Sequence, residues 1–374
     1  MKFIEAVEIE WFRGIREGLI EGFSDFTVLV GRNGAGKSTV LEALYLTSAW
    51  LKETDEVRNT SKYDYVVYRR GGRGRWRSAS YALWYSMDTS REVRIAIKFR
   101  GLWRELLIYH NTSPPTWLVM HECIKQRITQ GFGPAYTHYE LLGFRGGTTY
   151  LARKALKGGV ATFTHEEVLK YFTECYPVFT EVLRSTLLID EALLRDLGVV
   201  EKYSWPKVLS KRLDKEVVRV IKEEFEVDAE GLTYAPVGED TVLLLQLSNT
   251  AVRIDDLGDG ARHAVLTMLL LLATKPKLIL IEEPESKLHP RGMRVLTEAI
   301  LKYAKEYGAQ VVVSTHSMEF IKVGSELAKR LGIEMSLIHL ERSKDGALIT
   351  RRLNQPDLKL LTDLGIDPRF LDML

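Results

Sequence analysis

The residues from Gly31 to Thr39, with the sequence GRNGAGKST, carry the clearest chemical pattern in the chain. Two glycines separated by four residues and followed by a lysine and a hydroxyl side chain allow backbone N–H groups to curl around a phosphate. Lys37 would reach the β- and γ-phosphates of a nucleotide, and the Ser38 hydroxyl would hold Mg²⁺. The pattern predicts a site for a nucleoside triphosphate. Its residues are Gly31, Arg32, Asn33, Gly34, Ala35, Gly36, Lys37, Ser38 and Thr39.

Two adjacent carboxylates, Glu282 and Glu283, follow the apolar run 278–281. Such a run is typical of a buried strand in a parallel sheet, and ligands bind outside the carboxyl ends of such strands. We therefore expect Glu282 to bind Mg²⁺, either directly or through a water molecule, and Glu283 to orient and polarise the attacking water. A second apolar run, 311–313, ends just before His316, which is a candidate to sense the γ-phosphate or to hold the water.

A third candidate segment is Leu257-Gly258-Asp259-Gly260, at the start of a strongly apolar helix that we expect to extend to Ala273. Free N–H groups and the helix dipole make such a helix start ready to bind an anion. Arg262, about one turn into the helix, could add positive charge there or pair with Asp259.

The elements that must position these residues are visible in the apolar pattern. Phe26 to Val30 predicts a strand before the glycine-rich loop, and Val40 to Trp50 predicts a helix after it. Ile4, Val7 and Ile9 alternate with charged residues, which predicts an edge strand, followed by a short strand around 18–20.

We expect residues 50–110 to be antiparallel β. Two β-type runs, Tyr63 to Tyr68 and Ser80 to Ser86, would be joined by a tip rich in glycine and arginine. Alternating residues from Val93 to Phe99 predict a further hairpin that turns at Gly101. The signal from 111 to 159 is poor. Helical patterns follow, including one from Pro206 to Phe225, and then three short β-type runs at 232–235, 242–247 and 251–254.

The composition limits the classes of protein to which this chain could belong. The 374 residues, 45% hydrophobic, can bury a sizeable core, and the net charge of +2 gives no overall attraction to nucleic acid. Cys123 and Cys175 lack the spacing of a zinc site. The longest apolar run, 264–273, is too short to span a membrane, so we expect a soluble cytoplasmic protein without membrane insertion. Scarce Asn and Gln beside abundant Lys, Arg and Glu favour a thermophile source.

These motifs in this order resemble the ABC-type ATPases, and within them the SMC/RecF/OLD-like group. The resemblance is carried by FRGI at Phe12 to Ile15, GRNGAGKST, LGDG at Leu257 to Gly260, LILIEEPESKLHP and STHS. It implies an α/β P-loop ATPase in a single domain, 1–374, with a parallel core sheet. The nucleotide-binding core would comprise 1–50 and 251–374, with an antiparallel β segment at 51–110 and an inserted, mainly helical lobe at 111–250. The segment 318–374 is too short for an appended Toprim nuclease.

The resemblance also implies residue roles. Arg13 would reach the nucleotide, Glu285 to His289 would form the D-loop region, and His316 would be the switch histidine. Gly258, Asp259 and Gly260 would contact the nucleotide of a second subunit, which implies a homodimer. There are departures from the family pattern. Gly258 stands where transporters have serine, Glu282 stands where aspartate is usual, and no Q-loop glutamine is assigned.

The predicted function is an ATP-dependent dimerisation switch that serves nucleic-acid maintenance or defence against mobile elements, with a separate effector protein. A transporter nucleotide-binding subunit and a regulatory ATP-binding protein with little turnover remain as alternatives. DNA or RNA could bind the densest basic stretch, although this stretch could equally be a solvated turn or contact an acidic partner. The stretch comprises Arg69, Arg70, Arg73, Arg75, Arg77 and Trp76.

Overall fold

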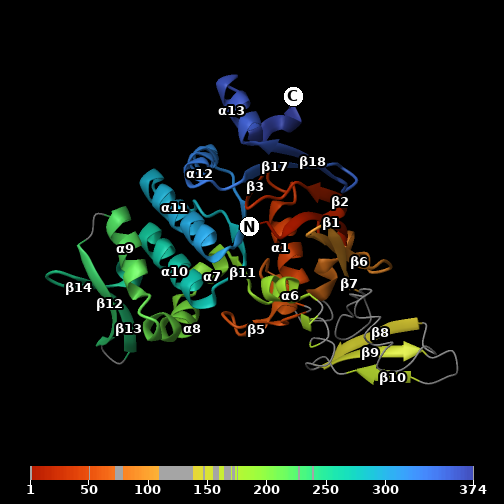
Figure 1. Cartoon of the computed structure of the whole chain (residues 1–374), viewed down its shortest axis with the longest axis horizontal. Helices are drawn as coiled ribbons and strands as arrows, with labels where there is room; N and C mark the ends of the chain where they lie inside the picture. The colour runs from red at the N-terminus through yellow and green to blue at the C-terminus, as the bar shows by residue number, and fades with distance from the viewer. Residues whose placement is uncertain are drawn as a thin grey trace.

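The protein is described here by a computed structural model that covers residues 2–49, 51–71, 79–108, 138–145, 148–154, 160–163, 170, 173–174, 176–225, 228–237 and 240–373. Its centre is a six-stranded sheet in the order β11-β15-β16-β3-β17-β18 (Figure 1). The strands are β3 (Phe26–Val30), β11 (Thr186–Ile189), β15 (Leu278–Glu282), β16 (Gln310–Ser314), β17 (Met335–Arg342) and β18 (Leu348–Asn354). All pairs are parallel except β17 with β18. The predicted parallel core sheet is confirmed.

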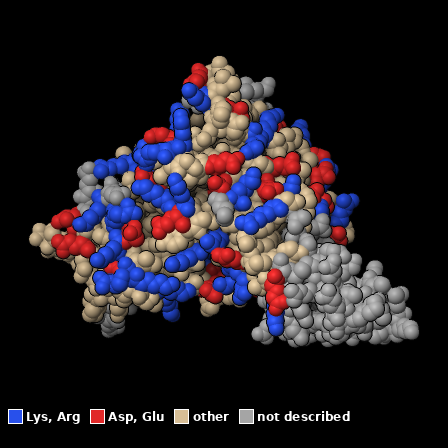
Figure 2. All heavy atoms as spheres, viewed as in Figure 1, with Lys and Arg blue, Asp and Glu red and all other residues tan. Residues whose placement is uncertain are grey.

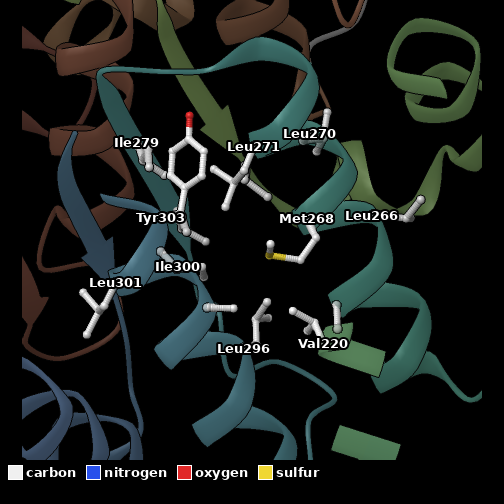
Figure 3. Packing of buried hydrophobic residues seen from close by; sticks show 14 of the residues in the cluster. Val220, Leu266, Met268, Leu270, Leu271, Ile279, Leu296, Ile300, Leu301 and Tyr303 are labelled. Atoms are coloured by element: carbon white, nitrogen blue, oxygen red, sulfur yellow. The ribbon is translucent and has the colours of Figure 1, made fainter. Parts of the chain in front are cut away.

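Each face of this sheet packs against a different layer because strand side chains alternate between faces. Leu278 and Leu280 of β15 join the core around α1 (Lys37–Thr47), whereas Ile279 and Ile281 join the core on the other side. That second layer consists of α10 (Asp259–Thr274), α11 (Pro290–Tyr307) and α12 (Met318–Leu331) (Figure 1). Figure 3 shows apolar side chains of α10 and α11 meeting, with Met268 between the two helices.

A second, antiparallel sheet covers the other side of α1 in the order β2-β1-β6-β7. Its strands are β1 (Ile4–Phe12), β2 (Ile15–Glu21), β6 (Val93–Phe99) and β7 (Leu102–Ile108). The hairpin predicted from Val93 is confirmed, but β1 is not the edge strand that its charges predicted. Glu8 and Glu10 do not face solvent alone, because Arg94 of β6 pairs with them at 2.8 and 2.7 Å.

The predicted strands at 63–68 and 80–86 are wrong. The first run is a helix, α2 (Lys62–Tyr68), and the second forms two short 3₁₀ turns, η1 (Ser80–Leu83) and η2 (Tyr85–Met87). The Ser61 side chain caps α2 by accepting a hydrogen bond from the Tyr63 N–H. Tyr63, Val66 and Val67, with helical spacing, are buried in the core around α1. Their β-branched and aromatic side chains imitate a strand in the sequence. Two short strands, β4 (Thr54–Asp55) and β5 (Thr60–Ser61), precede α2.

The remaining segments add smaller layers at the periphery. Strands β8 (His138–Arg145), β9 (Thr148–Lys154) and β10 (Val160–Phe163) form one sheet, and β12 (Ala229–Val237), β13 (Asp240–Leu247) and β14 (Ala251–Arg253) form another, as predicted for 232–254. Helices α6 (Pro177–Arg184), α7 (Glu191–Arg195), α8 (Leu197–Ser210) and α9 (Asp214–Phe225) lie between them in sequence, and η3 (Ile254–Asp256) precedes α10. The chain ends with α13 (Gln355–Asp363) and η4 (Pro368–Met373). The division into segments at 50, 110 and 250 stays a prediction.

No helix among the described residues has both the length and the apolar character needed to cross a bilayer.

Candidate functional site

The glycine-rich loop connects β3 to α1 and has the backbone geometry that its glycines predict. Gly31, Gly34 and Gly36 have φ angles of 138°, 79° and 103°, in the region that favours glycine. A Cβ atom on Gly31 would lie 2.2 Å from the Leu340 carbonyl oxygen, so any larger residue would force the loop or β17 to shift. Gly36 caps α1 without a side-chain hydrogen bond. Backbone N–H groups at the start of this helix are therefore available to a phosphate.

Lys37, the first residue of α1, folds back over this loop. Its Nζ donates to the carbonyl oxygens of Gly31 at 2.8 Å and Arg32 at 3.1 Å, and the residue is 6% exposed. Burial lowers the pKa of Lys37 to about 8, although the nearby carboxylates of Glu283 and Glu282 oppose this shift. The structure thus brings the predicted phosphate-binding lysine close to both predicted catalytic-site carboxylates.

Glu282 and Glu283 lie at the carboxyl end of β15, beside the end of β16. Glu282 is paired across the parallel ladder with Ser314, and the Glu283 N–H donates to the Ser314 carbonyl at 2.9 Å. Glu283 is exposed and has a φ angle of 48°, in the left-handed region, so the extended backbone of β15 ends before it. One oxygen lies 3.7 Å from His316 Nε2. Two residues separated by 33 positions in the sequence therefore meet at the site, as the parallel-strand argument predicts.

The loop that carries His316 is held on two sides. Glu285 Oε1 accepts hydrogen bonds from the Thr315 hydroxyl at 2.5 Å and from the His316 N–H at 3.2 Å. Arg369, from the C-terminal η4 turn, donates to the His316 carbonyl at 2.7 Å. Burial and the nearby Lys37 lower the pKa of His316, which favours the neutral imidazole. These contacts hold the backbone of His316, while its side chain is 40% exposed.

The start of α10 is exposed. Gly258 caps the helix, and a Cβ atom there would meet nothing within 4 Å. Asp259 pairs with Lys287 at 3.5 Å rather than with Arg262, whose guanidinium donates to the Arg195 carbonyl. Of the two roles considered for Arg262, pairing with Asp259 is therefore wrong. A pocket of about 220 Å³ connects the α10 start to Glu282 and Glu283.

Arg13 is buried beside the site, with 7% of its side chain exposed. Its Nε lies 3.2 Å from Glu42 Oε2, and its other nitrogens donate to the carbonyl oxygens of Val66 and Ala82. The predicted contact of Arg13 with a nucleotide stays a prediction. Glu42 lies on α1 and is fully buried. A lone carboxylate on an otherwise apolar helix was a signal in the sequence that could have singled it out.

The basic stretch does not join two strands, because the described residues before it form the helix α2 and those after it form 3₁₀ turns. Arg69 ends α2 with its side chain only 8% exposed, paired with Glu282, Glu42 and Asp190. Arg70 is 41% exposed and pairs with Glu42 at 2.8 Å. The stretch from 72 to 78, with Arg73, Arg75, Arg77 and Trp76, lies outside the described residues.

The donors gathered near Lys37 fit Mg²⁺. Ser38 offers a hydroxyl and Glu282 a carboxylate, and oxygen ligands of this kind suit Mg²⁺ when nucleotide phosphates complete the shell. The Ser314 hydroxyl beside Glu282 is buried and has no hydrogen-bond partner among the described residues, which leaves one more oxygen for a polar ligand. In the described part of the chain, no group of three or more His, Cys, Asp or Glu side chains is placed to hold a metal ion by itself.

Known protein families match both parts of the chain that form this site. A family model described as an AAA ATPase domain matches residues 1–99, and one described as an AAA domain, putative AbiEii toxin, Type IV TA system, matches residues 185–322. An ATP/GTP phosphatase of Helicobacter pylori is 21% identical over 86% of this chain and 87% of its own length. The lipoprotein-releasing system ATP-binding protein LolD 2 of Chlorobaculum tepidum is 32% identical over 23% of this chain and 36% of its own. The SMC head domain from Thermotoga maritima is 13% identical, covers 94% of this chain and 100% of its own, and has a TM-score of 0.45.

Proposed function

We propose that this chain, which is an ABC-type ATPase of the SMC/RecF-like group, uses ATP binding and hydrolysis to close and reopen a homodimer. Hydrolysis itself agrees with the ATPase family models and with the ATP/GTP phosphatase relative. The switch rests on one observation. The phosphate-binding loop, Glu283 and His316 converge at the ends of neighbouring strands, whereas the start of α10 at Gly258 is exposed and open.

The chemistry follows from the residues that converge. Protonated Lys37 would exchange its carbonyl partners for the β- and γ-phosphates of ATP. Glu283 would accept a hydrogen bond from the attacking water and hold it in line, and neutral His316, 3.7 Å away, would fix the carboxylate or the water. Mg²⁺ at Ser38 and Glu282 would neutralise charge on the phosphates.

A second subunit would complete the site. The free N–H groups at the start of α10 form an anion site, and the exposed position of Gly258 leaves them accessible to the γ-phosphate bound by a partner. With glycine in place of serine, backbone N–H groups rather than a hydroxyl would make this contact. Closure would then depend on ATP, and hydrolysis would weaken it.

Mixing two inactive variants tests the shared site. Lys37→Ala removes the phosphate-binding lysine, and Gly258→Glu adds a carboxylate that repels the γ-phosphate at a position where the fold has room for it. Gly260→Glu is a poorer choice, since a Cβ atom there would lie 3.2 Å from the Lys287 carbonyl. A mixed dimer contains one intact composite site, so partial ATPase recovery is expected. Absence of recovery from demonstrated mixed dimers would refute the shared site, as would ATP-saturated protein that stays monomeric.

We place the switch in nucleic-acid maintenance or defence, with a separate effector protein. The description of one family model as a putative toxin of a type IV TA system supports the defence setting. On the face shown in Figure 2, basic and acidic side chains are interspersed, which favours a protein partner over extended contact with a nucleic-acid backbone. Salt-sensitive binding of DNA or RNA in the presence of ATP would reverse this preference. The transporter alternative is weaker because the transporter subunit aligns with less than a quarter of the chain.

A further inference from the structure

Arg69, at the C-terminal end of α2, contacts three carboxylates at once. Its Nη2 forms an ion pair with Glu282 Oε2 and lies 3.2 Å from Asp190 Oδ2, while its Nη1 lies 3.3 Å from Glu42 Oε1. Only 8% of its side chain is exposed. The guanidinium therefore joins three elements that surround the candidate site: α1, the residue after β11, and the end of β15.

Two of these carboxylates are themselves held firmly by other groups. Asp190 accepts hydrogen bonds from the Tyr65 hydroxyl, from Arg58 at 3.2 Å and from the Leu193 N–H at 3.0 Å. Glu42 is fully buried and also pairs with Arg13 at 3.2 Å. Arginine presents its donors in a rigid planar fork. Because Glu42 and Asp190 hold the guanidinium of Arg69, the fold fixes the direction from which it meets Glu282.

Glu282 is the one partner in this set that stands at the predicted metal site. It is one methylene longer than the aspartate found at this position in the ATPases that the motifs resemble, so it has one more rotatable bond to order. Its pair with Arg69 engages Oε2, and Oε1 has no hydrogen bond among the described residues. Carboxylates that bind metals are commonly held by such outer partners, which fix their orientation.

We propose that Arg69 is a positioning residue that holds one oxygen of Glu282 so that the other oxygen faces the metal of a metal–nucleotide complex. This inference rests on the proposed function, because it assumes that the chain binds a metal–nucleotide complex at Ser38 and Glu282. It gives the first arginine of the basic stretch a role inside the ATPase site instead of a role on a nucleic-acid surface.

Metal binding without turnover tests the proposal. Electron paramagnetic resonance of free Mn²⁺, in the presence of the non-hydrolysable analogue β,γ-imido-ATP, gives a dissociation constant for each variant. Arg69→Lys keeps a positive charge but loses the fork, and we expect Mn²⁺ binding to weaken about tenfold. Arg70→Lys is the matched control, since Arg70 also pairs with Glu42 but does not contact Glu282. Its effect should stay below about twofold.

A second background separates positioning from general damage. In Glu282→Asp the carboxylate is too short to keep the Arg69 pair, so adding Arg69→Lys should change Mn²⁺ binding by less than about twofold. A folded Arg69→Lys protein that binds Mn²⁺ as tightly as wild type overturns the proposal. Tighter binding also overturns it, because Arg69 would then compete with the metal.

Two further outcomes are distinguishable. If Arg69→Lys does not fold, the melting temperature of Glu282→Gln is measured instead, without metal, and compared with that of the wild type. Loss of the partly buried pair should lower this temperature, and an unchanged or higher temperature overturns the proposal. Wild-type protein that binds no Mn²⁺ with the analogue overturns the proposed function together with this inference. Wild-type binding with unaffected Arg69→Lys overturns the inference alone.

Discussion

Lys62, the first residue of α2, offers a quantitative test of how this helix packs on α1. The residue is 2% exposed, its Nζ donates to the Ser48 hydroxyl at 2.7 Å, and the ammonium lies 5.4 Å from the centre of the Tyr45 ring. Burial lowers the pKa of Lys62 from 10.5 to about 7. Lys62→Met keeps a side chain of similar length without the charge, and Ser48 keeps its own bond to the Tyr45 carbonyl at 2.6 Å.

The direction in which stability changes with pH follows from proton linkage. Between pH 7 and pH 10.5 the unfolded chain holds the Lys62 proton more tightly than the folded chain does, so wild-type stability rises with pH across that window. Below pH 7 both states are protonated, and the full cost of burying the charge is present. At about 1.4 kcal/mol per pH unit, that cost has an upper limit of about 5 kcal/mol, and about 2.5 kcal/mol of it is relieved between pH 6 and pH 9.

Lys62→Met should therefore stabilise the protein most at pH 6, and its gain should shrink by about 2.5 kcal/mol at pH 9. Urea unfolding at the two pH values measures the free energies. Lys302→Met is the control, because Lys302 forms a surface pair with Glu298 at 2.7 Å and is 45% exposed. Its effect should stay within about 0.5 kcal/mol at both pH values. An equal gain for Lys62→Met at both pH values, or a loss at pH 6, would refute the reasoning.

Three other substitutions test the site. Glu283→Gln should keep ATP binding but lower turnover by about 10²- to 10⁴-fold, because an amide cannot act as the base; near-normal steady-state hydrolysis would contradict this. Arg369→Gln releases the His316 carbonyl and should lower kcat about tenfold with little change in ATP affinity, whereas equal loss of both would indicate general damage. Gly31→Ala places a Cβ atom 2.2 Å from the Leu340 carbonyl and should cost about 2–4 kcal/mol in urea unfolding; a milder effect would show that the loop can relax.

The site could be predicted from sequence where a local rule applied. The glycines of the P-loop mark positive φ angles, and apolar runs mark the strands whose carboxyl ends carry Glu282, Glu283 and His316. The same rule would have found Asp190, which directly follows the buried run of β11. The residues on either side of this run have helical patterns, which concealed the strand in the sequence.

Other features depend on contacts that no local pattern reports. Arg69 and Glu282 meet across 213 positions in the sequence, and Arg369 reaches the His316 carbonyl from the last turn of the chain. In α2, tertiary packing prevails over β propensity, since a buried face with helical spacing outweighs aromatic and β-branched content. In β1, the charges that suggested an exposed edge are neutralised by Arg94 on the adjacent strand.

The left-handed backbone at Glu283 has a consequence for how this sequence can change. For any residue other than glycine, this conformation costs about 1–2 kcal/mol, so glycine would be the more stable choice at this position. Random drift and stability-guided engineering would both favour removing the glutamate, and the resulting protein would fold better while losing the group assigned to hydrolysis. The strained backbone is the cost of placing a glutamate at this point, so stabilised forms of this ATPase that are meant to hydrolyse ATP should leave the position untouched.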